Sequence, residues 1–339
     1  MRRFHLARLT PKGDCRLEAA AWQTGAPMIR RRRSMAWILL LASLATGLLT
    51  AGCTRPTATQ ACQMNVVATT TFLRDIAQNV AGSKFTVRGL IPIGMDHHTY
   101  EPTPREVAEA VGSDLLITNG AGLEGTLGVT LRNAGGREKI VAASSGLVSR
   151  TPKPGEPPLE NASEPDPHFW LDPVLVETYV SNIKDAFARA DPGNAPLYEG
   201  NATLYIAQLR DLDAWIRAQV DLIPPAQRKL VMDHLSHGYF ADRYGLRVEG
   251  AVIPSASPGD VVSAKQLTRL TTLIERDGVK AIFVELGENP WLAKQVAAEA
   301  HVKVVTDLLD HSLTAPSGQA PTYLAMMHYD TNLIVEALR

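Results

Sequence analysis

The sequence predicts an α/β fold of two doubly wound lobes, each with a mostly parallel sheet, joined by one long rigid helix. Three observations predict this fold. Short apolar, β-branched segments alternate with helical periodicity from residue 64 onward. The second half of the chain repeats that alternation, and a long helical segment lies between the halves. Strands that alternate with helices are typical of parallel sheets covered by helices.

The first half of the fold is expected over residues 64–194. Strands are predicted at residues 64–70, 85–92, 114–120 and 139–144. Helical periodicity follows the first strand as far as Gly82, and a further helix is expected from Gly122 to Ala134. Residues 147–167, LVSRTPKPGEPPLENASEPDP, are rich in Pro, Glu and Ser, which predicts a surface loop.

The second half is expected over residues 224–339. Strands are predicted at residues 229–234, 246–253, 281–285 and 302–308. The segment SAKQLTRLTTLIERDG fits a helix that Gly278 stops, and a last helix is expected from Thr322 to Leu338.

Residues 195–223 connect the two halves with one continuous helical pattern. Apolar side chains recur there with a helical period, and the pair Pro224-Pro225 ends the pattern. A helix of this length is a rod of roughly 40 Å. Two interpretations stay open: a rigid spine that joins both lobes, or a helix that belongs wholly to one of them.

The region before the fold, residues 1–52, has the features of an export signal. A basic run from Arg30 to Arg33 precedes an apolar run from Ala36 to Leu49. This run is short for a membrane-spanning helix, which needs about 20 apolar residues. A basic segment followed by a short apolar segment is typical of a secretion signal. Translation from Met1, Met28 or Met35 stays open, because residues 1–27 form an unusual upstream extension.

The signal ends in LLTAGC, which resembles a bacterial lipobox. In that motif the cysteine, here Cys53, carries the lipid and becomes the new N-terminus. Thr50 stands where lipoboxes usually have Leu or Val, so an ordinary signal peptide cut nearby is the alternative. We therefore expect residues 53–63 to be a lipid-anchored tether and the protein to be extracytoplasmic, in the periplasm or at the cell surface.

Composition limits the kinds of site that the fold can hold. The formal net charge is -1, so no basic footprint indicates nucleic acid as a partner. After Cys53 only Cys62 remains, and it lies in the tether. A metal site in the folded body must therefore use histidine and carboxylate rather than thiolate.

Four of the nine histidines follow predicted strands, on short loops that turn signals hold stiff. His98 precedes the capping box TPRE, His168 lies in DPHFWLDP, His234 follows KLVMD, and His311 lies in LLDHSL. Ligands of open α/β sheets bind at the carboxyl ends of strands. Two lobes that face each other could bring these imidazoles to one ion in the cleft between them. Four protein ligands fill a tetrahedral shell, which suits holding a metal rather than activating water.

The chain resembles the metal-binding solute-binding lipoproteins of bacterial zinc and manganese ABC importers, known as the cluster A-I (cluster 9) family. The resemblance extends from about Asn65 to Leu338. It is carried by several long motifs in order: DHHTYEPTP, NGAGLEG, DPHFWLDP, HGYFADRYGL, AIFVE and APTYLAMMHYD.

The resemblance also implies which residues bind the metal. The family motif D-x-H-x-Y-E-P selects His98 and leaves His97 as a neighbour that we expect to be exposed. DPHFWLDP carries over His168, and the third position falls on His234, where some relatives have Glu. His237, three residues later, could share a helix face with His234. We expect it instead to lie at the surface or behind a ligand.

The fourth position departs from the family pattern. Many relatives have Asp in a segment such as T-D-S-L, and the corresponding sequence here is D-H-S-L. His311 takes the aspartate position, and Asp310 is the alternative ligand or a partner that orients the imidazole. Glu285 ends a predicted strand near the cleft, either behind the ligands or as an ordinary edge carboxylate.

By this resemblance the protein is the substrate-binding component of an ABC metal importer, not an enzyme. It would deliver its ion to a membrane permease driven by a separate ATPase, and we expect a monomer. Histidine ligands favour Zn²⁺ over the alternative, Mn²⁺. The absence of histidine from residues 147–167 weakens that preference, since many zinc carriers of the family have a His-rich loop there. A zinc hydrolase would need a motif such as H-E-x-x-H, which is absent. A surface adhesin with a structural metal remains an alternative.

Overall fold

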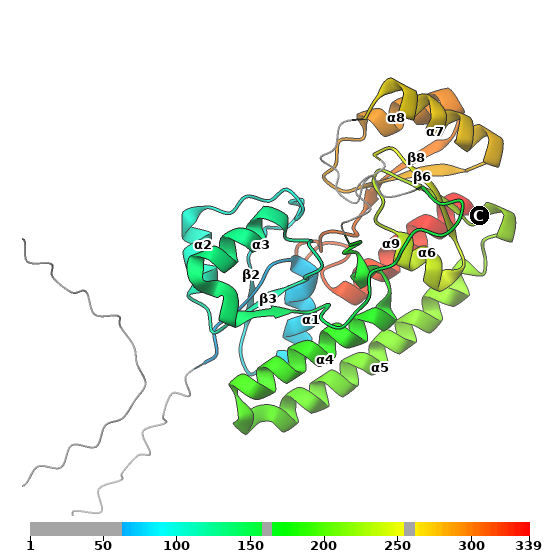
Figure 1. Cartoon of the computed structure of the whole chain (residues 1–339). Helices are drawn as coiled ribbons and strands as arrows, with labels where there is room; N and C mark the ends of the chain where they lie inside the picture. The colour runs from blue at the N-terminus through cyan, green and yellow to red at the C-terminus, as the bar shows by residue number, and fades with distance from the viewer. Residues whose placement is uncertain (1–62, 158–164, 254–261) are drawn as a thin grey trace, which may run out of the picture. The chain divides into compact units, whose positions relative to one another are not determined.

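The computed structural model describes residues 63–157, 165–253 and 262–339 (Figure 1). Residues Gln60–Arg339 form one compact unit. The signal region, Cys53 and nearly all of the tether lie outside the described residues. None of the described helices combines the length and the apolar character that crossing a membrane requires.

The first lobe is built on a parallel sheet with the strand order β2-β1-β3-β4. Its strands are β1 (Val66–Ala68), β2 (Val87–Gly89), β3 (Leu115–Thr118) and β4 (Ile140–Ala142). Its helices are α1 (Thr71–Ala81), α2 (Pro104–Val111), α3 (Gly125–Leu131) and α4 (Pro173–Ala190). Short helical turns lie at Arg132–Gly136, Arg137–Lys139, Phe169–Leu171 and Pro192–Asn194. Helix α3 ends earlier than the predicted Ala134, and Gly135, with φ of 101°, breaks the helical path just beyond it.

The second lobe repeats this topology with the order β6-β5-β7-β8, again all parallel. Its strands are β5 (Lys229–Met232), β6 (Arg247–Ala251), β7 (Ala281–Glu285) and β8 (Lys303–Leu308). Its helices are α6 (Gly238–Tyr244), α7 (Ala264–Asp277), α8 (Trp291–Ala300) and α9 (Tyr323–Leu338), and a short turn lies at Pro225–Gln227. Gly278 ends α7 in the left-handed conformation, as the sequence predicts.

Helix α5 (Ala195–Val220) runs along α4 for much of its length (Figure 1). Its 26 residues correspond to about 39 Å at 1.5 Å per residue. It packs on α1 and α4 of the first lobe and on α6 and α9 of the second. The helix therefore makes contacts with both lobes, which favours the spine over a helix confined to one of them.

The two sheets share one apolar core. Its buried side chains come from both halves of the chain, from Val66 and Phe72 to Phe283 and Leu338, and include the inner face of α5. Smaller clusters lie on the other faces of the sheets: one under α2 and α3, the other under α7 and α8. Because the main core is common to both lobes, separating them would expose apolar surface.

Hydrogen bonds also link the two lobes around the segment that follows β8. The backbone N–H of Gly94 donates to Ser312 Oγ over 2.9 Å, and the N–H of Leu313 donates to Thr71 Oγ1 over 2.9 Å. The indole Nε1 of Trp170 donates to the carbonyl of Asp310 over 2.7 Å. The segment that contains His311 is thus held by the first lobe although it follows a strand of the second.

Trp170 makes one of these bonds and further buried contacts with both halves of the chain, so its loss should be costly. Its side chain is 0% exposed and stacks on Phe72 at 4.5 Å, and its carbonyl accepts from the Tyr323 hydroxyl over 2.7 Å. We expect Trp170→Ala to lower the free energy of unfolding in urea by about 3–5 kcal/mol. The matched control is Trp291→Ala, since Trp291 is 64% exposed and should change stability by about 0.5 kcal/mol or less. Equal effects of the two substitutions would contradict this account.

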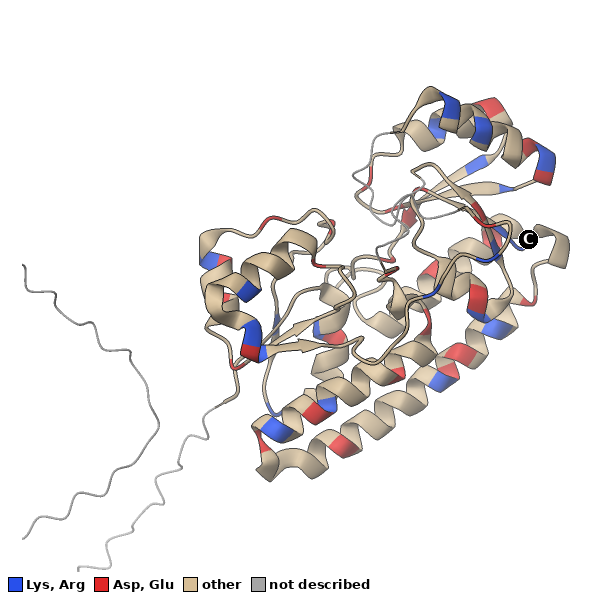
Figure 2. Cartoon of the chain, in the orientation of Figure 1, with Lys and Arg blue, Asp and Glu red and all other residues tan. Residues whose placement is uncertain are grey.

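Charged side chains of both signs are interspersed along α4 and α5 (Figure 2). Arg210 of α5 forms a bidentate pair with Glu177 of α4, with N–O distances of 2.9 and 2.8 Å. This mixture agrees with the formal net charge of -1 and gives these helices no basic face for nucleic acid.

Candidate metal centre

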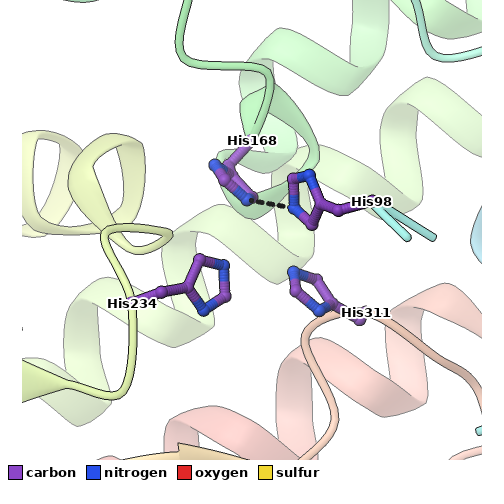
Figure 3. A group of neighbouring side chains, drawn as sticks. All are labelled: His98, His168, His234 and His311. Atoms are coloured by element: carbon purple, nitrogen blue, oxygen red, sulfur yellow. Dashed lines mark hydrogen bonds between the residues drawn. The ribbon is translucent and has the colours of Figure 1, made fainter. Parts of the chain in front are cut away.

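Four histidine side chains from four separate loops meet at one point in the structure (Figure 3). Each of His98, His168, His234 and His311 offers a ring nitrogen, and these four nitrogens all lie within 4.8 Å of one another. The loops follow β2, β4, β5 and β8, so two come from each sheet. The structure thus brings together the four residues that the sequence analysis singled out.

The loop before α2 sets the position of His98. The Asp96 carboxylate accepts from the backbone N–H of His98 over 2.8 Å and from the Thr99 hydroxyl over 2.6 Å, which closes a tight turn. Thr103 and Glu106 then form the predicted capping box at the start of α2. These local bonds fix the backbone on both sides of the imidazole.

A carboxylate holds the ring of His168. Asp166 Oδ1 lies 2.8 Å from His168 Nδ1 and also accepts from the backbone N–H of His168 over 3.1 Å. Both side chains are buried. The carboxylate favours the proton on Nδ1, which leaves Nε2 as the atom free to bind a metal.

His234 follows β5 directly and is oriented by two acids. Its backbone N–H donates to Asp233 Oδ1 over 2.8 Å, and its ring Nδ1 lies 3.3 Å from the same oxygen. Glu285 Oε1 is 3.1 Å from that Nδ1. The Nε2 atom of His234 is buried and has no hydrogen-bond partner among the described residues.

His311 shares the Glu285 carboxylate with His234. The Nδ1 atom of His311 contacts Glu285 Oε2, and its Nε2 is buried without a hydrogen-bond partner in the described part of the chain. An unpaired buried polar atom is costly unless a ligand satisfies it. Two such nitrogens that face one point indicate a binding site for a metal cation.

The spacing of the imidazoles fits a small cation. His98 Nε2 and His168 Nε2 are 3.3 Å apart (Figure 3). Two nitrogens on the edge of a tetrahedron with Zn–N bonds of about 2.0–2.1 Å would be about 3.3–3.4 Å apart. The other pairs lie within 4.8 Å, so small shifts of the rings would complete a tetrahedral set.

Burial keeps most of these rings neutral. It is the main cause that lowers the pKa of His98, His168 and His311 well below the usual value of 6.5, and the neighbouring imidazoles add to it. His234 differs. Burial alone would lower its pKa, but the hydrogen bond and charge of Asp233, with the charge of Asp310, raise it above 6.5. Neutral imidazole is the form that binds a metal.

Asp310 is a fully buried carboxylate that lies close to Glu285. Its oxygens are grouped with Glu285 and His311 and do not belong to the four-nitrogen set. Asp310 Oδ2 is 3.6 Å from Nδ1 of His237. Burial is the main cause that raises the pKa of Asp310 to about 6, and burial and the charge of Asp310 raise the pKa of Glu285 well above 4.5.

The structure overturns one expectation about the neighbouring histidines and narrows another. His97 is not exposed: only 1% of it is accessible, and its ring packs 4.2 Å from His311 and 5.4 Å from Trp170. The turn at Asp96 directs both adjacent rings inward, and burial lowers the pKa of His97 to about 3. Of the two places expected for His237, at the surface or behind a ligand, its 1% exposed fraction leaves the second. It shares no helix with His234, because α6 begins only at Gly238. Its buried ring contacts Ser236 and the Asp310 carboxylate.

Sequence analysis overlooked two residues that orient the imidazoles, Asp166 and Asp233. A signal was present in the sequence: each acid lies one or two positions before a candidate ligand, in D-P-H and D-H. A carboxylate so close in a turn can reach the histidine that follows it.

Comparisons with known proteins agree with this geometry. Residues 66–337 match the family described as zinc-uptake complex component A, periplasmic (ZnuA). The manganese-binding lipoprotein MntA of Halalkalibacterium halodurans is 29% identical over 275 residues, which cover 81% of this chain and 88% of the relative. The manganese ABC transporter substrate-binding lipoprotein PsaA of Streptococcus pneumoniae is 28% identical over 308 residues, which cover 89% of this chain and 97% of the relative.

The fold has solved counterparts as well. The periplasmic zinc-binding protein TroA of Treponema pallidum superposes with a TM-score of 0.73 at 27% identity, covering 81% of this chain and 99% of that one. The chain therefore belongs to the zinc-uptake complex component A family and is a substrate-binding component of an ABC metal importer, not an enzyme.

Proposed function

We propose that this protein captures Zn²⁺ through His98, His168, His234 and His311 and delivers it to the permease of its importer. The observation that carries the proposal is the convergence of four imidazole nitrogens, two of them buried and unpartnered, on one point. Four protein ligands leave no open position for a reacting water, which suits capture and release.

Zinc is favoured over manganese by the chemistry of the donors. Imidazole nitrogen suits zinc, and manganese prefers carboxylate and other oxygen ligands. The four-residue group contains no carboxylate, and Asp310 belongs to another group, with Glu285 and His311. Manganese remains the alternative, since MntA and PsaA are named for it and several buried carboxylates lie beside the imidazoles.

The proposal includes a place outside the cytoplasm and a set of partners. Export by the N-terminal signal and lipidation of Cys53 would tether a monomer to the membrane surface. The permease and its separate ATPase would take over the ion there. Support comes from the LLTAGC motif and from the relatives named as lipoproteins of ABC transporters.

The metal in the native protein tests the proposed cargo. Protein purified from its own membranes without added metal should contain about one zinc per chain by elemental analysis, as four imidazoles in one site predict. Competition between Zn²⁺ and Mn²⁺ on the same protein should favour zinc. Stoichiometric manganese in the native protein would overturn the zinc assignment, whereas a protein that binds neither ion would overturn the proposed function.

Zinc affinity should fall as the pH falls, in two stages. Protons compete with the ion for the free imidazoles, so a raised pKa brings the competition to higher pH and a lowered pKa defers it to lower pH. His234, whose pKa is raised, should compete first, above pH 6.5. His98, His168 and His311 should compete only well below 6.5.

Zinc titrations against a competing chelator of known pH dependence measure this effect. From pH 8 to 6 the affinity should fall by no more than about tenfold per pH unit, the limit for one competing proton. The fall should steepen at lower pH. A flat affinity from pH 8 to 5 would mean that carboxylates dominate the site, and a steep loss already near pH 7 would contradict the lowered pKa values.

Cys53→Ser should free the exported protein from the membrane. A protein that is held at the membrane by the lipid on one cysteine loses its attachment with that lipid. Detergent partitioning of the exported protein measures the change, with Cys62→Ser as the matched control that should stay in the detergent phase. Unchanged partitioning of Cys53→Ser would count against the lipobox.

A further inference from the structure

The topology of the second lobe places one carboxylate between two candidate ligands. In the order β6-β5-β7-β8, β7 lies between the strands that lead to His234 and to His311. Glu285 is the last residue of β7. A side chain at the carboxyl end of a middle strand can reach the loops that follow both neighbouring strands.

The contacts of Glu285 use both of its oxygens. Oε1 is 3.1 Å from Nδ1 of His234, and Oε2 contacts Nδ1 of His311. Its exposed fraction is 1%, and the two imidazoles are 0% and 7% exposed. Each oxygen thus lies beside a different ring, away from water, but neither contact has hydrogen-bond geometry in this structure, and Nδ1 of His234 also lies 3.3 Å from Asp233 Oδ1. Small rotations of the two rings would close both bonds to Glu285.

The backbone of Glu285 is held in place as well. Its N–H donates to Asp233 Oδ2 over 3.0 Å, and the pairing of β7 with β8 shifts register between Phe283 and Glu285. Such an irregularity re-aims the side chain that follows it. The same Asp233 also accepts from the backbone N–H of His234, so the carboxylate and one imidazole share an anchor.

The chemistry of these contacts decides which ring nitrogen faces the ion. A neutral imidazole has one N–H donor and one lone pair, and an ionised carboxylate only accepts. A ring that donates Nδ1–H to Glu285 presents the lone pair of Nε2 in the other direction. In both rings that Nε2 is the atom without a hydrogen-bond partner in the described chain.

We propose that Glu285 is the positioning residue of the second lobe: it accepts Nδ1–H from His234 and His311 together and thereby turns both Nε2 lone pairs toward the metal. The effect of Glu285 on metal binding rests on the proposed function, whereas its contacts with the two rings do not. Asp166 does the same for His168 alone, so Glu285 controls two metal–nitrogen bonds where Asp166 controls one.

The first test needs neither a metal nor a variant. Long-range ¹H–¹⁵N NMR of the histidine rings in the metal-free wild-type protein at pH 8 reports which nitrogen carries the proton. We expect His234 and His311 both to be in the Nδ1–H form. An Nε2–H form for either ring would overturn the proposal.

The second test is Glu285→Gln. The glutamine amide has one oxygen that accepts and an NH₂ group that only donates, so it can accept from one ring only. We expect at least one of the two imidazoles to change to the Nε2–H form, and zinc affinity to fall about 10–100-fold, as for other partners of metal ligands. Unchanged tautomers, or an affinity within about threefold of the wild type, would overturn the proposal.

Glu249→Gln is the matched control. Glu249 is 3% exposed in the same lobe, and its carboxylate pairs with Arg247 instead of a histidine. The control should change neither the tautomers nor the zinc affinity, and an equal loss in both variants would overturn the specific role of Glu285. Wild-type protein that binds no zinc or manganese would refute the proposed function alone, since the tautomers are measured without metal.

Discussion

His98→Ala is expected to abolish tight zinc binding. The substitution removes one of four nitrogens that converge within 4.8 Å, and the Nε2 of His168 then loses the neighbour that lies 3.3 Å away. Loss of a direct ligand should exceed the effect of losing a residue behind it, so zinc should bind at least about 100-fold more weakly. Competition titration of purified wild-type and variant protein with a zinc chelator measures the loss.

The matched control for this result is His328→Ala. His328 packs on Trp215, with ring centroids 4.1 Å apart, on α9 and outside the four-histidine group. Its removal should leave zinc affinity unchanged. If His98→Ala binds zinc as the wild type does, His98 is not a ligand and the proposed set of four is wrong.

His311→Ala is expected to weaken zinc binding more than Asp310→Ala. The ring of His311 belongs to the converging group, whereas the Asp310 carboxylate contacts His237 and lies beside Glu285. Asp310 holds the loop mainly through its carbonyl, which accepts from Trp170 and survives the substitution. We expect Asp310→Ala to cost no more than about 10–100-fold in zinc affinity, the range for residues behind a ligand.

The same chelator titration on both variants decides between the two residues. The His311→Ala site would keep three imidazoles and gain a position open to water. A larger loss for Asp310→Ala would make the aspartate the fourth ligand, as in many relatives, and would exclude His311.

Much of the fold could be predicted because local signals and tertiary packing agree. Every strand in the described residues lies within a predicted segment, since β-branched runs between turn residues are buried on parallel sheets. The capping box at Thr103 begins α2 where the sequence indicates, and the left-handed Gly278 ends α7 where the sequence indicates. The positions of His234 and His311 just after β5 and β8 follow from these boundaries.

Other features depend on contacts between distant segments and leave little trace in the sequence. His97 is buried because the turn at Asp96 and the ring of Trp170 enclose it, which no periodicity reports. His237 precedes α6 because the chain bends at Ser236 before the helix starts. The shared helix face that the spacing of His234 and His237 allows is therefore not formed.

The expected rigidity between the two lobes has causes besides helix α5. The shared core and the bonds from Gly94, Thr71 and Trp170 to the segment around His311 all oppose separation of the lobes. Sequence analysis assigned His311 to the second lobe by its strand, but its loop is anchored in the first. We therefore expect metal binding to order loops with only a small rotation between lobes.

A crystal structure of the zinc-loaded protein, with anomalous scattering measured at the zinc edge, tests the central claim most directly. The account predicts one zinc ion within about 2.0–2.1 Å of a ring nitrogen of each of His98, His168, His234 and His311, in tetrahedral geometry. A zinc ion bound by the Glu285 or Asp310 carboxylate in place of any of these four imidazoles would contradict it.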